Sequence, residues 1–143
     1  MKIYLGSDHR GFALKNKLIE YLSLQHEAID CGNTVFDPKD DYPDFAKAVA
    51  DKVIHDPSSL GIVICGSGIG VCMATNRIKG ARCGLGFDQN QVKHAREKDH
   101  INMLALSSDY LDFEENKAIV DAFLSSKELD DERYFRRINK IDN

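Results

Sequence analysis

Two features typical of membrane and secreted proteins are missing from this sequence. No apolar run approaches the roughly 18 residues that a membrane-spanning helix needs. Residues 1–5 lead directly into polar residues, without the apolar core of a signal peptide. With 43% hydrophobic and 29% charged residues, the composition is that of an ordinary globular protein. We therefore expect a cytoplasmic protein that does not bind membranes.

An excess of positive charge is also missing. The 19 Lys and Arg residues are outnumbered by 23 Asp and Glu residues, which gives a formal net charge of -4. Nucleic-acid-binding proteins normally carry a clustered basic excess, so no nucleic-acid partner is expected. A small anionic substrate stays open, because local basic residues matter more than the total.

Metal-binding cysteine patterns are absent as well. The four cysteines form no Cys-x-x-Cys pair and have no histidine companions at zinc spacing: Cys31, Cys65, Cys72 and Cys83. We expect reduced thiols and no metal site.

What the sequence does contain is an alternation of strand-like and helix-like segments. Five runs are predicted strands, at residues 2–6, 26–32, 60–65, 81–87 and 101–107. Five stretches have apolar residues at helical spacing, at 12–22, 45–53, 71–78, 90–99 and 114–124. The pattern predicts one α/β domain over residues 1–143, a Rossmann-like three-layer α/β/α fold with a five-stranded parallel sheet. The tail at 130–143 is a predicted helix that packs on the domain or on a partner subunit.

The stretch Cys65-Gly66-Ser67-Gly68-Ile69-Gly70 follows the third predicted strand and opens a helix. Its backbone N–H groups would point outward at a helix N-terminus, which favours anions. A dinucleotide fold needs Gly-x-Gly-x-x-Gly after the first strand, whereas here the third glycine comes one residue early. Asp88, at the end of the next strand, keeps a nucleotide module as a minor alternative; the absence of Gly-Lys-Ser/Thr excludes a P-loop.

Cys65 distinguishes this loop from a simple phosphate-binding turn. Most buried cysteines at strand ends are inert packing residues, and we interpret Cys31, Cys72 and Cys83 in that way. Cys65, however, lies where a helix N-terminus would stabilise a thiolate. A thiolate beside backbone N–H donors suggests proton abstraction next to a carbonyl, with the donors stabilising an enediolate.

Two further clusters are candidate binding groups. Asp8 and His9 follow the first strand and could bind sugar hydroxyls or act as an acid–base pair, although Asp8 could instead cap the next helix. Arg133 and Arg137 are four residues apart on one predicted helix face and could clamp a phosphate. A solvated basic face, paired with nearby acids, is the alternative for the arginines.

Several motifs in matching order resemble the type B ribose-5-phosphate isomerases and the related galactose- and allose-6-phosphate isomerases. The motifs are Gly6-Ser7-Asp8-His9-x-Gly11-x-x-Leu14-Lys15, Asp41-Tyr42-Pro43, Gly61-Ile62-Val63-Ile64-Cys65-Gly66-Ser67-Gly68-Ile69-Gly70, Ala74-x-Asn76-Arg77 and Asn102-Met103-Leu104-Ala105-Leu106. They span nearly the whole chain.

The resemblance implies an aldose–ketose isomerisation in the pentose phosphate pathway that needs no metal or cofactor. It also implies a homodimer, sometimes paired into tetramers, whose active sites combine residues from two subunits. By this resemblance Cys65 is the base that moves the proton between C1 and C2 of the sugar. The other implied residues are Ser67 and the N–H groups of Gly66, Gly68, Ile69 and Gly70 at the enediolate, Asp8 and His9 at the sugar, Tyr42 in the pocket wall, and Arg133 and Arg137 at the phosphate.

Three departures from the family pattern involve four positions. Lys98 and Asp99 stand where the family has its ring-opening histidine and the following asparagine. Asp109 replaces a phosphate-binding arginine, and Tyr134 replaces a histidine. A carboxylate facing a phosphate would repel it, so either Asp109 turns away or the substrate differs; Arg10 could restore the lost charge.

These departures lie at the phosphate and ring-opening ends and leave the Cys65 end intact. The leading hypothesis is interconversion of ribose 5-phosphate and ribulose 5-phosphate. An isomerase of another sugar phosphate, and a catalytically weakened homologue that only binds one, are the alternatives.

Overall fold

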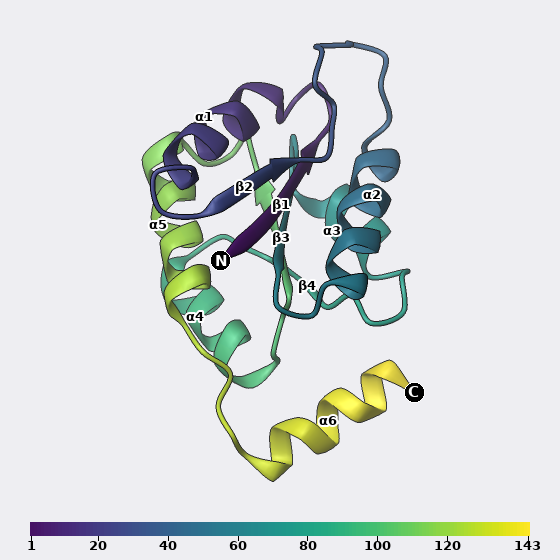
Figure 1. Ribbon diagram of the computed structural model, residues 1–143, viewed down its shortest axis with the longest axis vertical. Helices are drawn as coiled ribbons and strands as arrows, with labels where there is room; N and C mark the ends of the chain where they lie inside the picture. Colours follow the sequence, from purple (N-terminus) through teal and green to yellow (C-terminus); the bar gives the residue numbers. More distant parts are fainter.

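The computed structural model describes all of residues 1–143, as five strands and six helices (Figure 1). The strands are β1 (Lys2–Ser7), β2 (Glu27–Asp30), β3 (Leu60–Cys65), β4 (Cys83–Leu85) and β5 (Met103–Ser107). The helices are α1 (Phe12–Leu22), α2 (Tyr42–His55), α3 (Ile69–Thr75), α4 (Gln89–Lys98), α5 (Phe113–Ser125) and α6 (Glu132–Asp142).

The strands form one sheet in the order β2-β1-β3-β5-β4, and every neighbouring pair is parallel. The predicted five-stranded parallel sheet is thereby confirmed. After β2 the chain crosses back to the other side of β1, so the strand order reverses between β1 and β3. Loops that leave two such strands diverge and open a crevice at their carboxyl ends, where ligands bind in this class of sheet.

Two hydrophobic cores, one on each face of the sheet, give the three layers. Side chains such as Ile3, Ile62 and Leu104 pack with α1, α4 and α5 on one face. Tyr4, Val63 and Met103 alternate with them and pack with α2 and α3 on the other face. Figure 1 shows α1, α4 and α5 on one side of the sheet and α2 and α3 on the other. The continuous apolar runs of β1, β3 and β5 arise because both faces of these strands are covered.

Several predicted element boundaries differ from those in the structure, among them the boundaries of β4 and α3. The strand predicted at 81–87 pairs with β5 only from Cys83 to Leu85. The two residues before it form other hydrogen bonds: Ala81 N–H donates to the Ile78 carbonyl, and Arg82 N–H donates to the Asn102 side chain. The helix predicted at 71–78 begins two residues earlier, at Ile69, which moves its first turn closer to Cys65.

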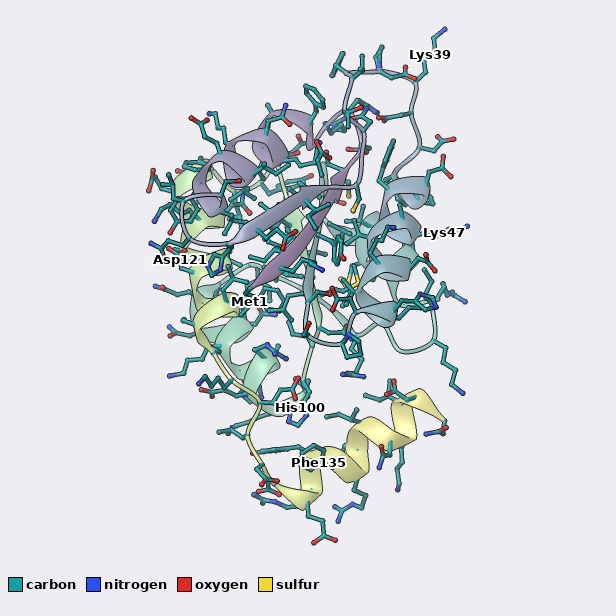
Figure 2. All side chains as sticks on the ribbon, in the orientation of Figure 1. Met1, Lys39, Lys47, His100, Asp121 and Phe135 are labelled. Carbon is teal, nitrogen blue, oxygen red and sulfur yellow. The ribbon has the colours of Figure 1, made fainter.

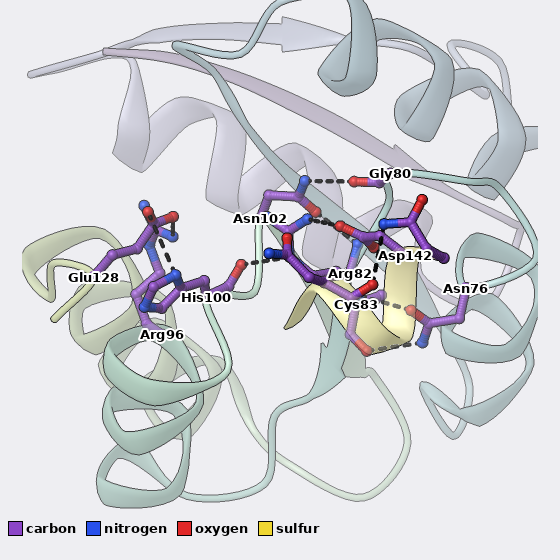
Figure 3. Close-up of polar contacts among 11 residues, drawn as sticks. Asn76, Gly80, Arg82, Cys83, Arg96, His100, Asn102, Glu128 and Asp142 are labelled. Carbon is purple, nitrogen blue, oxygen red and sulfur yellow. Dashed lines mark hydrogen bonds and ion pairs between the residues drawn. The ribbon is translucent and has the colours of Figure 1, made fainter. Parts of the chain in front are cut away.

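The predicted tail helix exists as α6 and packs where β4 and β5 begin. We call this side the amino edge, and the side where β1, β3 and β5 end, at Ser7, Cys65 and Ser107, the carboxyl edge. The rings of His100 and Phe135 meet edge-on at 5.1 Å, and Arg82 pairs with Asp142 at 3.1 Å (Figures 2 and 3). α6 therefore lies at the end of the sheet opposite the crevice. None of the six helices combines the length and apolarity required to cross a membrane.

Candidate active site

The turn that follows β3 presents backbone N–H groups at the carboxyl edge. β3 ends at Cys65, and the chain reaches α3 through Gly68, whose φ of 77° is in the left-handed region. A Cβ on Gly68 would lie 3.0 Å from the backbone carbonyl carbon of Leu106, so only glycine fits without displacement. The N–H groups of Gly66, Ser67 and Gly68 donate to no group within the chain. This turn therefore has unused donors, which is what an oxyanion site requires.

Cys65 lies at the inner end of this turn. The residue is 4% exposed, its thiol is free, and its side chain belongs to the face of the sheet covered by α2 and α3. It also borders the cavity described below, so the thiol is shielded from bulk water and still reachable by a small molecule.

The loop after β5 holds the glycine turn in place. The Ser107 hydroxyl donates to the Gly66 carbonyl at 2.7 Å, and Asp109 N–H donates to the same oxygen at 3.0 Å. Ser108 donates to the Cys65 carbonyl through its N–H at 3.0 Å and through its hydroxyl at 3.2 Å. These four bonds fix both carbonyls and thereby the turn. Gly66 and Ser67 line the cavity, whereas Gly68 is not among its lining residues.

The loop after β1 brings Asp8 to the same edge. Asp8 is 4% exposed, and its carboxylate accepts the N–H groups of Arg10 at 3.0 Å and Gly11 at 3.2 Å. The helix-capping alternative is thus partly correct, because Asp8 stabilises the turn that precedes α1. Asp8 also borders the cavity, so capping does not remove it from the site.

Asp109, for which the sequence left open whether it turns away or the substrate differs, does not turn away: it lines the cavity described below. Its carboxylate forms an ion pair with the Arg10 guanidinium, and the two side chains lie against Gly66. A Cβ on Gly66 would come within 2.7 Å of Asp109 Oδ2 and 2.8 Å of Arg10 Nε. The pairing raises the pKa of Arg10, first through the hydrogen bond and then through the charge of Asp109.

A cavity of about 480 Å³ connects these groups at the carboxyl edge. Tyr42 closes one side by packing over Gly70, where a Cβ would lie 2.7 Å from the phenol ring. The lining residues are Asp8, Arg10, Tyr42, Cys65, Gly66, Ser67, Ile69, Gly70, Met73, Asp109 and Tyr110. A hollow of about 630 Å³ beside α4 and α5 is larger, but it contains none of the predicted site residues.

His9 is next to this cavity but is not among its lining residues. Its Nδ1 lies 2.7 Å from Asp40 Oδ1, and its N–H donates to the same oxygen at 2.9 Å. The hydrogen bond with Asp40 raises the pKa of His9 above its usual value. Asn33 also donates to Asp40, and its carbonyl accepts from the fully buried Lys15 at 2.8 Å. His9 is therefore held against the 32–41 loop as a partly exposed imidazole.

Four predicted site residues lie away from the cavity of their own chain. Lys98 ends α4 and Asp99 follows it, in the short connection to β5, which begins at Met103. Arg133 and Arg137 are exposed on α6, and Arg133 pairs with Asp131 at 2.7 Å. Figure 3 shows the network that fixes this region, in which Arg82 links His100 to the end of α6. The structure thus separates the predicted residues into a carboxyl-edge set and an amino-edge set.

The other cysteines are less uniformly buried than predicted. Cys83 is 8% exposed, whereas Cys31 and Cys72 are half-buried. Hydrogen bonding from the Cys83 thiol, and then from Asn76, lowers the pKa of Cys72 to about 7. Chemical reactivity of a thiol in this chain therefore does not by itself identify Cys65.

Asp40 and the Arg10–Asp109 pairing were missed by the sequence reasoning. Asp40 lies in the long irregular loop, and no local pattern marks it as the partner of His9, 31 residues away. The sequence did contain a signal for the Arg10–Asp109 pairing, since Arg10 and Asp109 follow strands that end at the same edge of the sheet. The 99-residue separation of Arg10 and Asp109 is closed only by the sheet.

The chain has a doubly wound α/β fold, and a cysteine, a glycine turn and an acid meet at the carboxyl edge of its sheet. These features place it among the α/β proteins that bind small molecules at that edge. The chain belongs to the ribose/galactose isomerase family, whose sequence profile matches residues 3–141. The family predicted from the sequence motifs is thereby confirmed.

Individual relatives agree along the whole chain. A protein of Mycoplasma pneumoniae named as probable ribose-5-phosphate isomerase B is 45% identical over 97% of this chain and 91% of its own. Ribose-5-phosphate isomerase B of Mycobacterium tuberculosis is 41% identical over 97% of this chain and 86% of its own. The crystal structure of ribose-5-phosphate isomerase B from Mycoplasma genitalium with bound ribulose 5-phosphate has 44% identity and a TM-score of 0.93, covering 99% of this chain and 93% of the other.

Proposed function

We propose that this chain interconverts ribose 5-phosphate and ribulose 5-phosphate through an enediolate, with Cys65 as the base. The proposal depends above all on one observation: a free, buried thiol borders a cavity beside three backbone N–H groups that lack partners. The names of the relatives, and the ribulose 5-phosphate bound to the Mycoplasma genitalium enzyme, support the choice of substrate.

In the proposed reaction the Cys65 thiolate takes the proton from C2 of the open-chain aldose and returns it to C1. Negative charge develops on the substrate oxygens in between. The N–H groups of Gly66, Ser67 and Gly68 stabilise this charge, because they are fixed before the substrate arrives. Those of Ile69 and Gly70, with the Ser67 hydroxyl, are assigned to the same array. In the structure the Ile69 N–H donates to Ser67 Oγ at 3.2 Å, a bond that the substrate oxygen would replace. The reaction needs no metal ion or cofactor, since the thiolate supplies the base and the backbone supplies the charge stabilisation.

Sugar hydroxyls are assigned to Asp8 and to the Nε2 side of His9, with Tyr42 as a wall of the pocket. Asp8 keeps acceptor capacity because both of its backbone bonds go to one oxygen, Oδ1. Arg10 is assigned to the phosphate, as the one basic residue that lines the cavity.

The remaining groups would come from a second copy of the chain. Lys98, Asp99, Arg133 and Arg137 lie at the amino edge, so in a homodimer each subunit would supply them to the cavity of the other. Arg133 and Arg137 would then meet the phosphate, and Lys98 would occupy the ring-opening position. A homodimer, with or without pairing into tetramers, is therefore part of the proposal, as are a single domain over residues 1–143 and a cytoplasmic setting.

One observation favours a weaker second candidate, a homologue that binds a sugar phosphate with little turnover. Lys98 takes the ring-opening position, which therefore lacks an imidazole, the group that most often transfers protons in enzymes at neutral pH. An isomerase of a 6-phosphate sugar of the allose or galactose type is the third candidate.

The deciding experiment measures ribulose 5-phosphate formation from ribose 5-phosphate by the parent protein, with allose and galactose 6-phosphates in parallel. Cys65→Ser is expected to lower kcat by about 10²- to 10⁴-fold, the usual contribution of a general base. Cys31→Ser, outside the cavity, is the matched control and should retain activity. Equal turnover of the Cys65→Ser variant and the parent would exclude the proposed base, and binding without turnover would favour the second candidate.

A further inference from the structure

Asp109 has no role in the proposed reaction, yet it lines the cavity and touches the one basic side chain there. We propose that Asp109 is a positioning residue that holds the Arg10 guanidinium over Gly66, so that the remaining N–H groups of Arg10 bind the anionic end of the substrate. This inference rests on the proposed function, which supplies a phosphorylated sugar as the ligand.

The backbones of both residues are fixed independently of their side chains. Asp109 N–H donates to the Gly66 carbonyl at 3.0 Å, which attaches the loop after β5 to the glycine turn. Arg10 N–H donates to Asp8 Oδ1 at 3.0 Å, which fixes the loop after β1. The Arg10 side chain is then the mobile element, since a long arginine side chain loses rotamer entropy when it is ordered. Asp109 supplies the contact that orders it before the substrate binds.

Arg10 keeps binding capacity after it pairs with Asp109. The guanidinium carries five N–H donors, and the bond to Asp109 Oδ2 comes from one terminal nitrogen. The Arg10 side chain is 58% exposed, so the other donors can reach a ligand. Because Arg10 is the one cationic residue lining the cavity, beside the two carboxylates Asp8 and Asp109, a phosphate has no other attractive charge within the same chain.

The Arg10 and Asp109 side chains lie so close to Gly66 that they also limit which residues fit at position 66. A Cβ there would overlap Asp109 Oδ2 at 2.7 Å and Arg10 Nε at 2.8 Å. Both contacts involve ends of side chains, so the pair would be displaced while the turn itself could remain. Glycine at position 66 therefore permits the close approach of the Arg10 and Asp109 side chains to the turn.

The test compares KM and kcat for ribulose 5-phosphate, and the inhibition constant of inorganic phosphate, across a double-mutant cycle. Arg10→Ala should raise KM about tenfold or more, as expected for losing a charge-assisted hydrogen bond. Asp109→Asn should raise KM about three- to tenfold and leave kcat nearly unchanged, because the Cys65 end is untouched. In the double variant, Asp109→Asn should add nothing to Arg10→Ala. Glu114→Gln, which removes an exposed acid of α5, controls for the general change in charge.

The sign of the Asp109→Asn effect decides between two roles. If Asp109 merely repels the substrate, the variant binds more tightly and KM falls, which overturns the inference. An unchanged KM with normal turnover also overturns it and leaves the proposed isomerase intact. If the parent shows no turnover, the same order of affinities is expected for ribulose 5-phosphate binding measured by calorimetry. No binding by the parent would overturn both the inference and the proposed substrate class.

Discussion

Asp40 and His9 lie 31 residues apart in the sequence, yet their Oδ1 and Nδ1 atoms are 2.7 Å apart in the structure. The Asp40 carboxylate is 7% exposed and is also bound by Asn33, so it forms a rigid partner for a partly exposed imidazole. The pairing fixes the ring orientation and, through its hydrogen bond, raises the pKa of His9.

The first prediction concerns the titration of His9. Because hydrogen bonding to Asp40 raises the pKa of His9, the pairing stabilises the fold below the unfolded value of about 6.5 and is lost as pH rises through the folded pKa. Titration followed by NMR should give a His9 pKa above 6.5 in the parent and a lower one in Asp40→Asn. Asp37→Asn, on the same loop but bonded to Lys39 N–H, should leave the His9 pKa unchanged. A parent value below 6.5 would contradict the pairing.

A second prediction separates two of the three glycines with positive φ, Gly68 and Gly80. At Gly68 a Cβ would meet the Leu106 backbone, whereas at Gly80, with φ of 90°, the nearest atom is 3.6 Å away. Gly80→Ala should therefore lower the free energy of unfolding by about 1–2 kcal/mol, the cost of the left-handed conformation alone. Gly68→Ala should lower it by about 1–3 kcal/mol more, through overpacking against immobile backbone. Urea unfolding measures both, and equal losses would show that the turn can relax.

A third prediction tests the shared site by mixing two inactive proteins. Cys65→Ser lacks the proposed base at the carboxyl edge, and Arg137→Ala lacks a proposed phosphate ligand at the amino edge. A heterodimer with sites shared between subunits contains one intact site out of two. Random exchange should then restore about a quarter of parental activity, since half of the dimers are mixed. Activity that stays at the sum of the two variants would show that each cavity uses residues of its own chain.

A fourth prediction addresses ring opening. Lys98→His places an imidazole at the end of α4, where its neutral form can exchange protons near pH 7. If Lys98 limits the reaction, kcat for ribose 5-phosphate should rise about tenfold or more and follow a group with a pKa near 6.5. Lys93→His, one turn or more away on α4, is the matched control and should leave kcat unaltered. A Lys98→His variant no faster than the parent would show that another step limits turnover.

The sequence by itself was sufficient for the layer architecture and for the position of Cys65, the proposed base. Apolar runs on both faces of β1, β3 and β5 require helices on both sides of a parallel sheet, and strand ends in such a sheet meet at one edge. Cys65 could therefore be placed beside the glycine turn from local pattern alone, because the two are adjacent in the chain. The short length of β4 was not predictable, since it depends on the Asn102 side chain taking the Arg82 N–H.

Only the tertiary structure decided how the charged groups are partnered. Residues far apart in the sequence, such as Arg10 and Asp109 or His9 and Asp40, meet because loops from different strands converge at the carboxyl edge. The same packing carries Arg133 and Arg137 to the amino edge, since α6 docks through His100, Arg82 and Ile138 where β4 and β5 begin. Spacing of four residues shows that two arginines share a helix face, but it does not show which end of the sheet that helix covers.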